Sequence, residues 1–427
     1  MNSSLDFGVG LTRALTGRRR VLCALVAIVV TCVLWGRPFS WMMRRGDPDA
    51  RDFAPIIAGA HCLFRSCDPY DSNAAKRFFF DLTGGDVFMR PETPVYPPST
   101  FLVVSPLLLL KWRPMYLTWA LLSAGALLAA YILLILKFEL FTSLVAYLPI
   151  VISIQSGIIF PALWVGQPAV LAIASGAIAV ISLVSGTAPV LSTLLLALSL
   201  SLKPQLVLLP AIYLLFRKTT RIKSIAALIL ATLAFVIGAS LLHSQLGSFS
   251  FFARESANVK LALEHGHLSD PSSANRDSPD FLNLAMPLSR LDLSLPAANR
   301  ISFLGTFALF AGLAYAYLHE KTARSRPYTI IAVLILISLL AAYHRGYDRL
   351  LILLIIPALW ELRSRSRALY WTLTATMFLW IFNHRILENL SARAARFQIT
   401  AFLELAMCLL FLASLMNWSG QNRPESG

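Results

Sequence analysis

Apolar runs separated by short polar stretches repeat along almost the whole chain. They cover residues 21–36, 99–110, 115–136, 142–160, 167–184, 188–216, 222–243, 301–318, 327–343, 347–361, 368–382 and 398–416. A helix needs roughly 20 apolar residues to cross the hydrocarbon core of a bilayer, and its backbone groups must bond to each other because lipid offers them no partners. The pattern therefore predicts an all-α, polytopic membrane protein with about 12 transmembrane helices.

Prolines interrupt the apolar runs between residues 142 and 216. They are Pro149, Pro161, Pro168 and Pro204. Proline breaks or kinks a helix because it lacks a backbone N–H and its ring clashes with the preceding turn. The sequence leaves the span boundaries in this part of the chain open, and one segment there could be re-entrant.

Two long polar segments, residues 37–98 and 247–299, separate groups of apolar runs. Loops rich in Lys and Arg face the cytoplasm, and the basic stretches at residues 18–20, 111–113, 217–223, 321–326 and 363–367 all fall on one side of the span count. We therefore expect a single integral membrane domain over residues 1–427 in the plasma membrane. Both termini would be cytoplasmic, and residues 37–98 and 247–299 would be the first and second extracytoplasmic loops.

Composition supports the membrane assignment and limits the classes of partner that the protein can bind. The chain is 57% hydrophobic and only 14% charged, with a mean hydropathy of +0.67. Its net charge of +15 follows from the basic cytoplasmic loops, whereas nucleic-acid binding would need a basic face on a soluble domain. We predict membrane lipids and no nucleic acid among its partners.

The first long loop carries two features with open interpretations. Residues 53–63 form an amphipathic stretch that could lie as a helix along the membrane interface. Cys62 and Cys67 are close in sequence, and an oxidising compartment could join them. Two unpaired thiols fit the same spacing equally well, so the sequence does not decide between them.

Short polar motifs follow one another in a characteristic order. They are Asp52-Phe53, Asp68-Pro69-Tyr70, Tyr96-Pro97-Pro98, Gly166-Gln167, Lys203-Pro204-Gln205 and Tyr343-His344-Arg345-Gly346-Tyr347. Taken together they resemble glycosyltransferase family 87, whose members are multi-spanning enzymes of the GT-C fold, with large extracytoplasmic loops, that use polyprenyl-phosphate sugars. The family usually has asparagine shortly after the Gly-Gln pair, where this chain has Pro168-Ala169.

The chemistry of such a transfer needs few groups. When a hydroxyl displaces a lipid phosphate from the anomeric carbon of a sugar, the leaving group is already a stable anion. A second carboxylate acting as general acid, as in glycoside hydrolysis, is unnecessary. One general base for the acceptor hydroxyl and cationic or hydrogen-bonding groups for the phosphate are enough.

Asp52 is the predicted base, since the resemblance matches it to the family's proposed catalytic base and it follows the first span directly. His344, Arg345 and Lys203 are predicted to bind the donor phosphate. An ion cluster of His344, Arg345 and Asp348, or a Lys203 that reaches toward the interface, is the alternative.

Substrate contacts are predicted for Tyr70, Tyr96 and Gln167. Tyrosines are also expected at any membrane interface. The expected topology puts Gln167 near the cytoplasmic face, so it could reach an extracytoplasmic site only through a re-entrant segment.

The sequence thus predicts an inverting hexosyltransferase without cofactor or metal. It would move a hexose, mannose by the resemblance, from a polyprenyl-phosphate donor to a lipid-linked or cell-envelope glycan acceptor on the extracytoplasmic face. A secondary transporter or lipid flippase would show two related halves with broken helices. An O-antigen-type polymerase or ligase would take a lipid-diphosphate oligosaccharide instead. The sequence leaves the sugar, acceptor, linkage and oligomeric state open.

Overall fold

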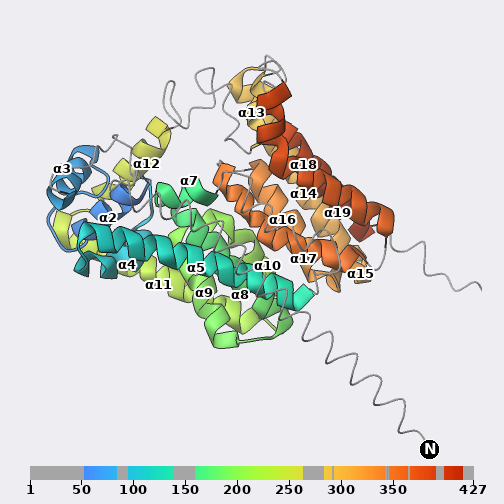
Figure 1. The fold of residues 1–427 in the computed structure, drawn as a ribbon, viewed down its shortest axis with the longest axis horizontal. Helices are drawn as coiled ribbons and strands as arrows, with labels where there is room; N and C mark the ends of the chain where they lie inside the picture. Colours follow the sequence, from blue (N-terminus) through green and yellow to red (C-terminus); the bar gives the residue numbers. More distant parts are fainter. Residues whose placement is uncertain are drawn as a thin grey trace, which may run out of the picture.

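The computed structural model describes residues 52–83, 95–138, 159–262, 283–290, 293–341, 344, 346–363, 366–390 and 399–416. Every regular element within these ranges is an α-helix or a 3-10 helix (Figure 1). The all-α prediction is therefore confirmed for this part of the chain. The predicted span at residues 21–36 and most of the one at 142–160 lie outside the described residues.

The helices follow the predicted apolar runs closely. In chain order they are α2 Phe53–Cys62, α3 Ser72–Thr83, α4 Pro98–Val104, η1 Ser105–Leu109, α5 Trp112–Phe138, α7 Ile159–Trp164, α8 Pro168–Ser185, α9 Pro189–Leu202, η4 Pro204–Leu206, α10 Leu208–Phe216, α11 Arg221–Leu246, α12 Ser250–Ala262, α13 Ala285–Arg290, α14 Leu295–His319, α15 Lys321–Arg324, α16 Pro327–Ala341, η6 Gly346–Leu351, α17 Ile352–Arg363, α18 Arg367–Leu390 and α19 Ile399–Met416.

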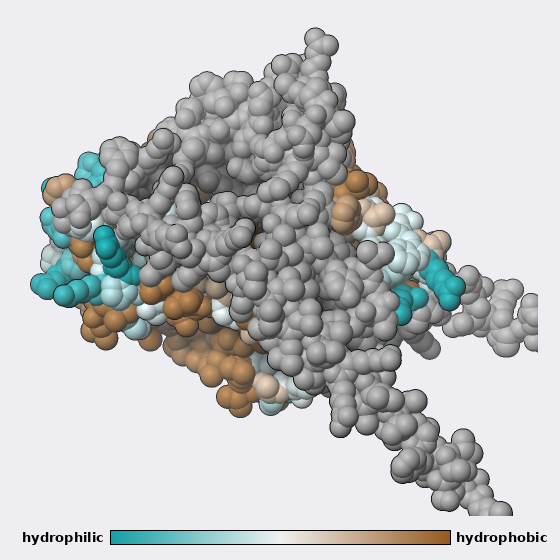
Figure 2. All heavy atoms as spheres, in the orientation of Figure 1, coloured by the Kyte–Doolittle hydropathy of each residue, from teal (hydrophilic) through white to brown (hydrophobic). Residues whose placement is uncertain are grey.

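Among the described helices, α5, α8, α11 and α14 are long and apolar enough to cross a membrane. Large apolar side chains are exposed along α11, among them Ile222, Ile229 and Leu233. Apolar residues form a band along the lower face of the molecule in Figure 2. Exposed apolar surface of this kind suits contact with lipid, so the chain is a membrane protein. The total of twelve crossings stays a prediction.

Helices α5 and α8 run in the same direction between two ends of the bundle. At one end, which we call the site end, Trp119 near the start of α5 donates from Nε1 to the carbonyl of Gly166, 3.0 Å away, just before α8 begins. At the other, the far end, Tyr328 contacts the last residues of both helices. Its ring centroid is 5.2 Å from that of Phe138, and its hydroxyl is 3.0 Å from Ser185 Oγ.

The predicted crossing over residues 99–110 does not hold. Helices α4 and η1 both pack against the short helix α2. The next residues return to the site end, where the Trp112 ring packs against Phe53 and Phe79. A helix of this length spans about 18 Å at roughly 1.5 Å per residue, less than the roughly 30 Å of a hydrocarbon core. Lys111 and Arg113 therefore lie with the site end and not with the other basic loops.

The predicted single span over residues 188–216 is also wrong, because it is broken at Lys203 and Pro204. Helix α9 follows the far end of α8, and α10 returns there, where the Tyr213 ring lies 6.2 Å from that of Tyr317 at the end of α14. The break divides the run into two shorter apolar helices, and the contact of Gln167 with Asp52 places residues 166–167 at the site end.

Helix α2 forms where predicted but does not lie on an interface. All of its residues except His61 are buried. Phe53 stacks on Trp119 with ring centroids 5.3 Å apart, and a Cβ at Gly59 would overlap the ring of Phe101. The amphipathic stretch is therefore part of the core, where it holds Asp52 at the site end.

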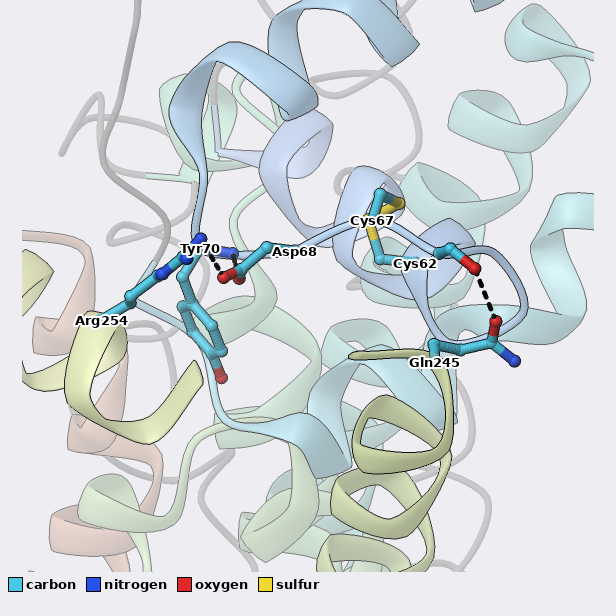
Figure 3. Close-up of a disulfide and its surroundings, with 7 residues drawn as sticks. Cys62, Cys67, Asp68, Tyr70, Gln245 and Arg254 are labelled. Carbon is cyan, nitrogen blue, oxygen red and sulfur yellow. Dashed lines mark hydrogen bonds and ion pairs between the residues drawn. A yellow bond between two sulfur atoms is a disulfide. The ribbon is translucent and has the colours of Figure 1, made fainter. Parts of the chain in front are cut away.

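A disulfide between Cys62 and Cys67 closes the turn after α2 (Figure 3). Just beyond it, Asp68 forms an ion pair with Arg254 of α12, and Asn258 Nδ2 donates to the Tyr70 carbonyl, 2.9 Å away. The sequence left open whether these cysteines form a disulfide or two free thiols, and the structure contains the disulfide. We call this assembly of the turn and α12 the clasp.

Candidate active site

Asp52 and Gln167 meet at the site end. The Asp52 side chain is 8% exposed, and Gln167 Nε2 donates to its Oδ2 over 2.8 Å. The backbone N–H groups of Asp52 and Phe53 both donate to the carbonyl of Val165, at 3.0 and 3.1 Å. These three hydrogen bonds fix the start of α2 against the start of α8.

Gly166 makes this approach possible. Its φ is +72°, in the left-handed region where side chains other than hydrogen are strained. A Cβ on Gly166 would also collide with Cβ of Phe53. The contact with α2 therefore requires glycine before Gln167, and this explains the glycine of the Gly-Gln motif.

One atom of Gln167 has no hydrogen-bond partner. Gln167 is 3% exposed, and its Oε1 is among the buried polar atoms without one in the structure. Leaving such an oxygen unsatisfied costs about 1–3 kcal/mol. Because this oxygen is buried, a substrate hydroxyl can reach it only after a local rearrangement.

Lys203, His344 and Asp348 form a second polar group, which we call the phosphate cluster for the role proposed below. Lys203 Nζ lies 3.0 Å from Asp348 Oδ1, and His344 Nδ1 lies 3.0 Å from Asp348 Oδ2. His344 and Asp348 are both 1% exposed, whereas the Lys203 side chain is 13% exposed. Lys203 is thus a partly exposed cation with a buried counter-ion.

Neighbouring groups support the cluster. Ser338 Oγ of α16 donates to the carbonyl of Gln205 over 3.1 Å and lies 3.5 Å from His344 Nε2. Lys203 Nζ lies 4.8 Å from the centre of the Tyr347 ring, within reach of a cation–π contact. The break after α9, the end of α16 and η6 therefore converge here.

Sequence reasoning named Asp348 only as part of an alternative ion cluster. His344 and Asp348 are only four positions apart, so a contact between them could be expected from the sequence. The link from Asp348 to Lys203 could not, because 145 positions separate them.

Four of the predicted site residues, Asp52 with Gln167 and Lys203 with His344, form two groups joined by α8. Gln167 caps the start of that helix, and η6 packs against it. Arg345 lies outside the described residues. The roles of all the site residues stay predictions.

Tyr70 has a structural role in the packing of the fold. It is 2% exposed, its hydroxyl donates to the carbonyl of Tyr96 over 2.9 Å, and its ring stacks on Phe251. Burial raises its pKa above the ordinary value, with a smaller contribution from Glu255. A sugar contact by the Tyr70 ring would need this packing to open.

An apolar groove of about 310 Å³ lies between α10, α14 and α16. Its lining includes Leu209 and Tyr213 from α10, Leu313 and Tyr317 from α14, and Leu334 from α16. Leu209 and Leu334 are each four residues from the contact between Gln205 and Ser338. The groove therefore begins about one helical turn from the phosphate cluster and extends toward the far end.

The helical fold and the two polar groups agree with a sequence comparison. Residues 95–342 match glycosyltransferase family 87. Because this stretch is more than half of the 427 residues, the chain belongs to that family and is a glycosyltransferase. Lys203, Gln167 and Tyr96 lie inside the matched stretch, and Asp52 and His344 lie outside it. No curated protein and no solved structure matches the chain.

Proposed function

We propose that the protein transfers a hexose, with mannose the first candidate, from a polyprenyl phosphate to a lipid-linked or cell-envelope glycan on the extracytoplasmic face of the plasma membrane. The observation that carries this proposal is the buried pair of Asp52 and Gln167 in a chain of glycosyltransferase family 87. Asp52 takes the proton of the acceptor hydroxyl as that oxygen attacks the anomeric carbon. Attack from the face opposite the phosphate inverts the configuration.

Gln167 supports this role of Asp52 in two ways. Its Nε2 holds one carboxylate oxygen of Asp52 in place. Its unpaired Oε1 is suited to a second hydrogen bond from the acceptor sugar. A base must lie within hydrogen-bond reach of the proton that it removes, and two contacts on one sugar would fix that geometry.

The phosphate cluster supports a lipid-phosphate donor. Lys203 presents an exposed edge of its side chain beside a buried histidine, and both can donate to a phosphate. The adjacent groove is almost wholly apolar, which suits the first isoprenyl units of the lipid. No proton has to reach the leaving phosphate, so the cluster needs only to stabilise its growing negative charge.

One observation favours a second candidate function. The broken helix at Lys203 resembles the discontinuous helices that hold substrates in secondary transporters. A lipid flippase would bind the same donor without breaking its glycosidic bond. A polymerase or ligase would break a bond to a lipid diphosphate, so donor chemistry separates the three.

The test is transfer of radiolabelled mannose from polyprenyl-phosphate mannose to endogenous lipid in vesicles that carry the protein. We expect transfer by the wild type, less than about 1% of that rate with Asp52→Asn, and an unchanged rate with Asp81→Asn. Asp81 is an exposed carboxylate on α3 in the same loop. Full activity in a well-expressed Asp52→Asn variant would exclude Asp52 as the base. Transfer from lipid-diphosphate oligosaccharides alone would favour a polymerase, and movement of intact donor across the membrane a flippase.

A further inference from the structure

The carboxylate of Asp348 is buried within the phosphate cluster, where the proposed transfer does not use it. Its two oxygens lie 3.0 and 3.4 Å from Lys203 Nζ, and Oδ2 is also 3.0 Å from His344 Nδ1. Both partners are side chains that we assign to the donor phosphate. We therefore expect Asp348 to act on the reaction through Lys203 and His344.

Asp348 is less accessible to a ligand than Lys203. Its side chain is 1% exposed, whereas 13% of the Lys203 side chain is exposed. A ligand can thus reach the ammonium group of Lys203 before it reaches the carboxylate. A carboxylate facing a phosphate would repel it, and here Lys203 and His344 contact both of its oxygens.

Asp348 also restricts where the two side chains can be. Lysine has a long and flexible stem, and ordering it before the ligand arrives removes an entropic cost from binding. A histidine that donates Nδ1–H to a carboxylate is held in one orientation, with Nε2 left for another partner. In this structure Nε2 points toward Ser338, whose Oγ is 3.5 Å away.

We propose that Asp348 is a positioning residue that holds Lys203 and His344 in place as one binding unit for the phosphate of the lipid donor. The proposal rests on the proposed function and goes further, because it assigns donor binding to a residue that does not touch the donor. It also explains why the break after α9 and the start of η6, 145 positions apart, meet at one buried carboxylate.

Kinetics of purified protein test this role. Asp348→Asn keeps the size of the side chain and removes its charge. We expect the KM for the donor to rise about tenfold or more, because Lys203 and His344 lose a charge-assisted contact that holds them in place. The KM for the acceptor should change less than twofold. Asp348→Glu should recover part of the donor affinity, and Asp81→Asn should change neither value. A variant with fewer folded molecules but unchanged KM values would overturn the proposal.

Direct binding separates this proposal from the proposed function. Polyprenyl phosphate without sugar is titrated into wild-type protein and Asp348→Asn in lipid nanodiscs. About tenfold weaker binding by the variant supports the positioning role. Equal binding, with sugar transfer by the wild type intact, overturns the positioning role alone. A wild type that neither transfers sugar nor binds polyprenyl phosphate overturns both.

Discussion

The side-chain amide of Gln167 donates a hydrogen bond to the carboxylate of Asp52 across 115 positions of sequence. Helices α2 and α8 both begin at this contact, and Gly166 and Phe53 fit against each other directly beside it. The pair gives the site end its geometry, because one side chain supplies the charge and the other fixes its direction.

Replacing Gln167 by leucine should impair catalysis more than folding. The variant keeps the buried volume but leaves one oxygen of Asp52 without its donor. We expect kcat to fall roughly 10- to 100-fold, as for the loss of a hydrogen bond to a charged group worth about 1.5–3 kcal/mol. Gln245→Leu, in α11 and away from the pair of Asp52 and Gln167, serves as the control. An unchanged kcat in folded Gln167→Leu would show that Asp52 needs no such support.

Two glycines with nearly the same φ allow a matched test of the approach between α2 and α8. Gly166 (φ +72°) faces Cβ of Phe53, whereas Gly186 (φ +74°) has open space around it. Alanine at either position carries the cost of a left-handed backbone, about 1 kcal/mol. Gly166→Ala must in addition displace α2. We expect a clearly lower Tm for Gly166→Ala than for Gly186→Ala, with transfer reduced only in the former; equal Tm values would contradict the close packing.

The disulfide should stabilise the clasp by a modest amount. Cys62 and Cys67 are five positions apart, and closing so short a loop in the unfolded chain is worth about 2 kcal/mol in the chain-entropy model. Cys62→Ser together with Cys67→Ser should lower the Tm and abolish its sensitivity to reductant. Cys408→Ser, at the buried free thiol, should keep that sensitivity. Thiol alkylation that labels Cys62 and Cys67 in unreduced protein would exclude the bond.

The clasp should also respond to pH through Glu255. Partial burial raises the pKa of Glu255 to about 7 from an ordinary 4.5, and its hydrogen bond with Tyr70 opposes that rise. A carboxyl group whose pKa is raised by folding stabilises the protein in its protonated form. This stabilisation is complete below about pH 4.5 and is lost as pH rises through about 7. Thermal melting at several pH values should show this dependence for the wild type and a weaker one for Glu255→Gln. Identical pH profiles would rule it out.

The positions of most membrane helices could be predicted from the sequence because such helices have long apolar runs. Their directions could not. The run at residues 99–110 has the composition of a span but packs beside α2, and the run at 188–216 hides a break at Lys203. Counting apolar runs cannot detect either, since both depend on which residues fold back on which. The sequence therefore put Gln167 on the wrong side of the membrane relative to Asp52.

The chemistry could be predicted in part for a similar reason. Lys203 is predicted because a charged group in apolar surroundings needs a purpose, whereas Asp52 and His344 are predicted from motifs that resemble those of the family. Which charges pair with which is a property of three-dimensional packing, so the contact between Asp348 and Lys203 could not be read from the sequence. The unsatisfied Oε1 of Gln167 is likewise visible only once its neighbours are known.

The pairing of Lys203 with Asp348 has a consequence for how the protein is made. Lys203 is at the break between α9 and α10 and is synthesised early, whereas Asp348 follows only after several further helices, among them α11, α14 and α16. Until η6 arrives, the ammonium group has to remain in water or reach a lipid headgroup, because an unpaired charge in hydrocarbon is costly. The hairpin of α9 and α10 can therefore reach its final depth only when the C-terminal half has been inserted, which makes the phosphate cluster one of the last parts of the protein to form.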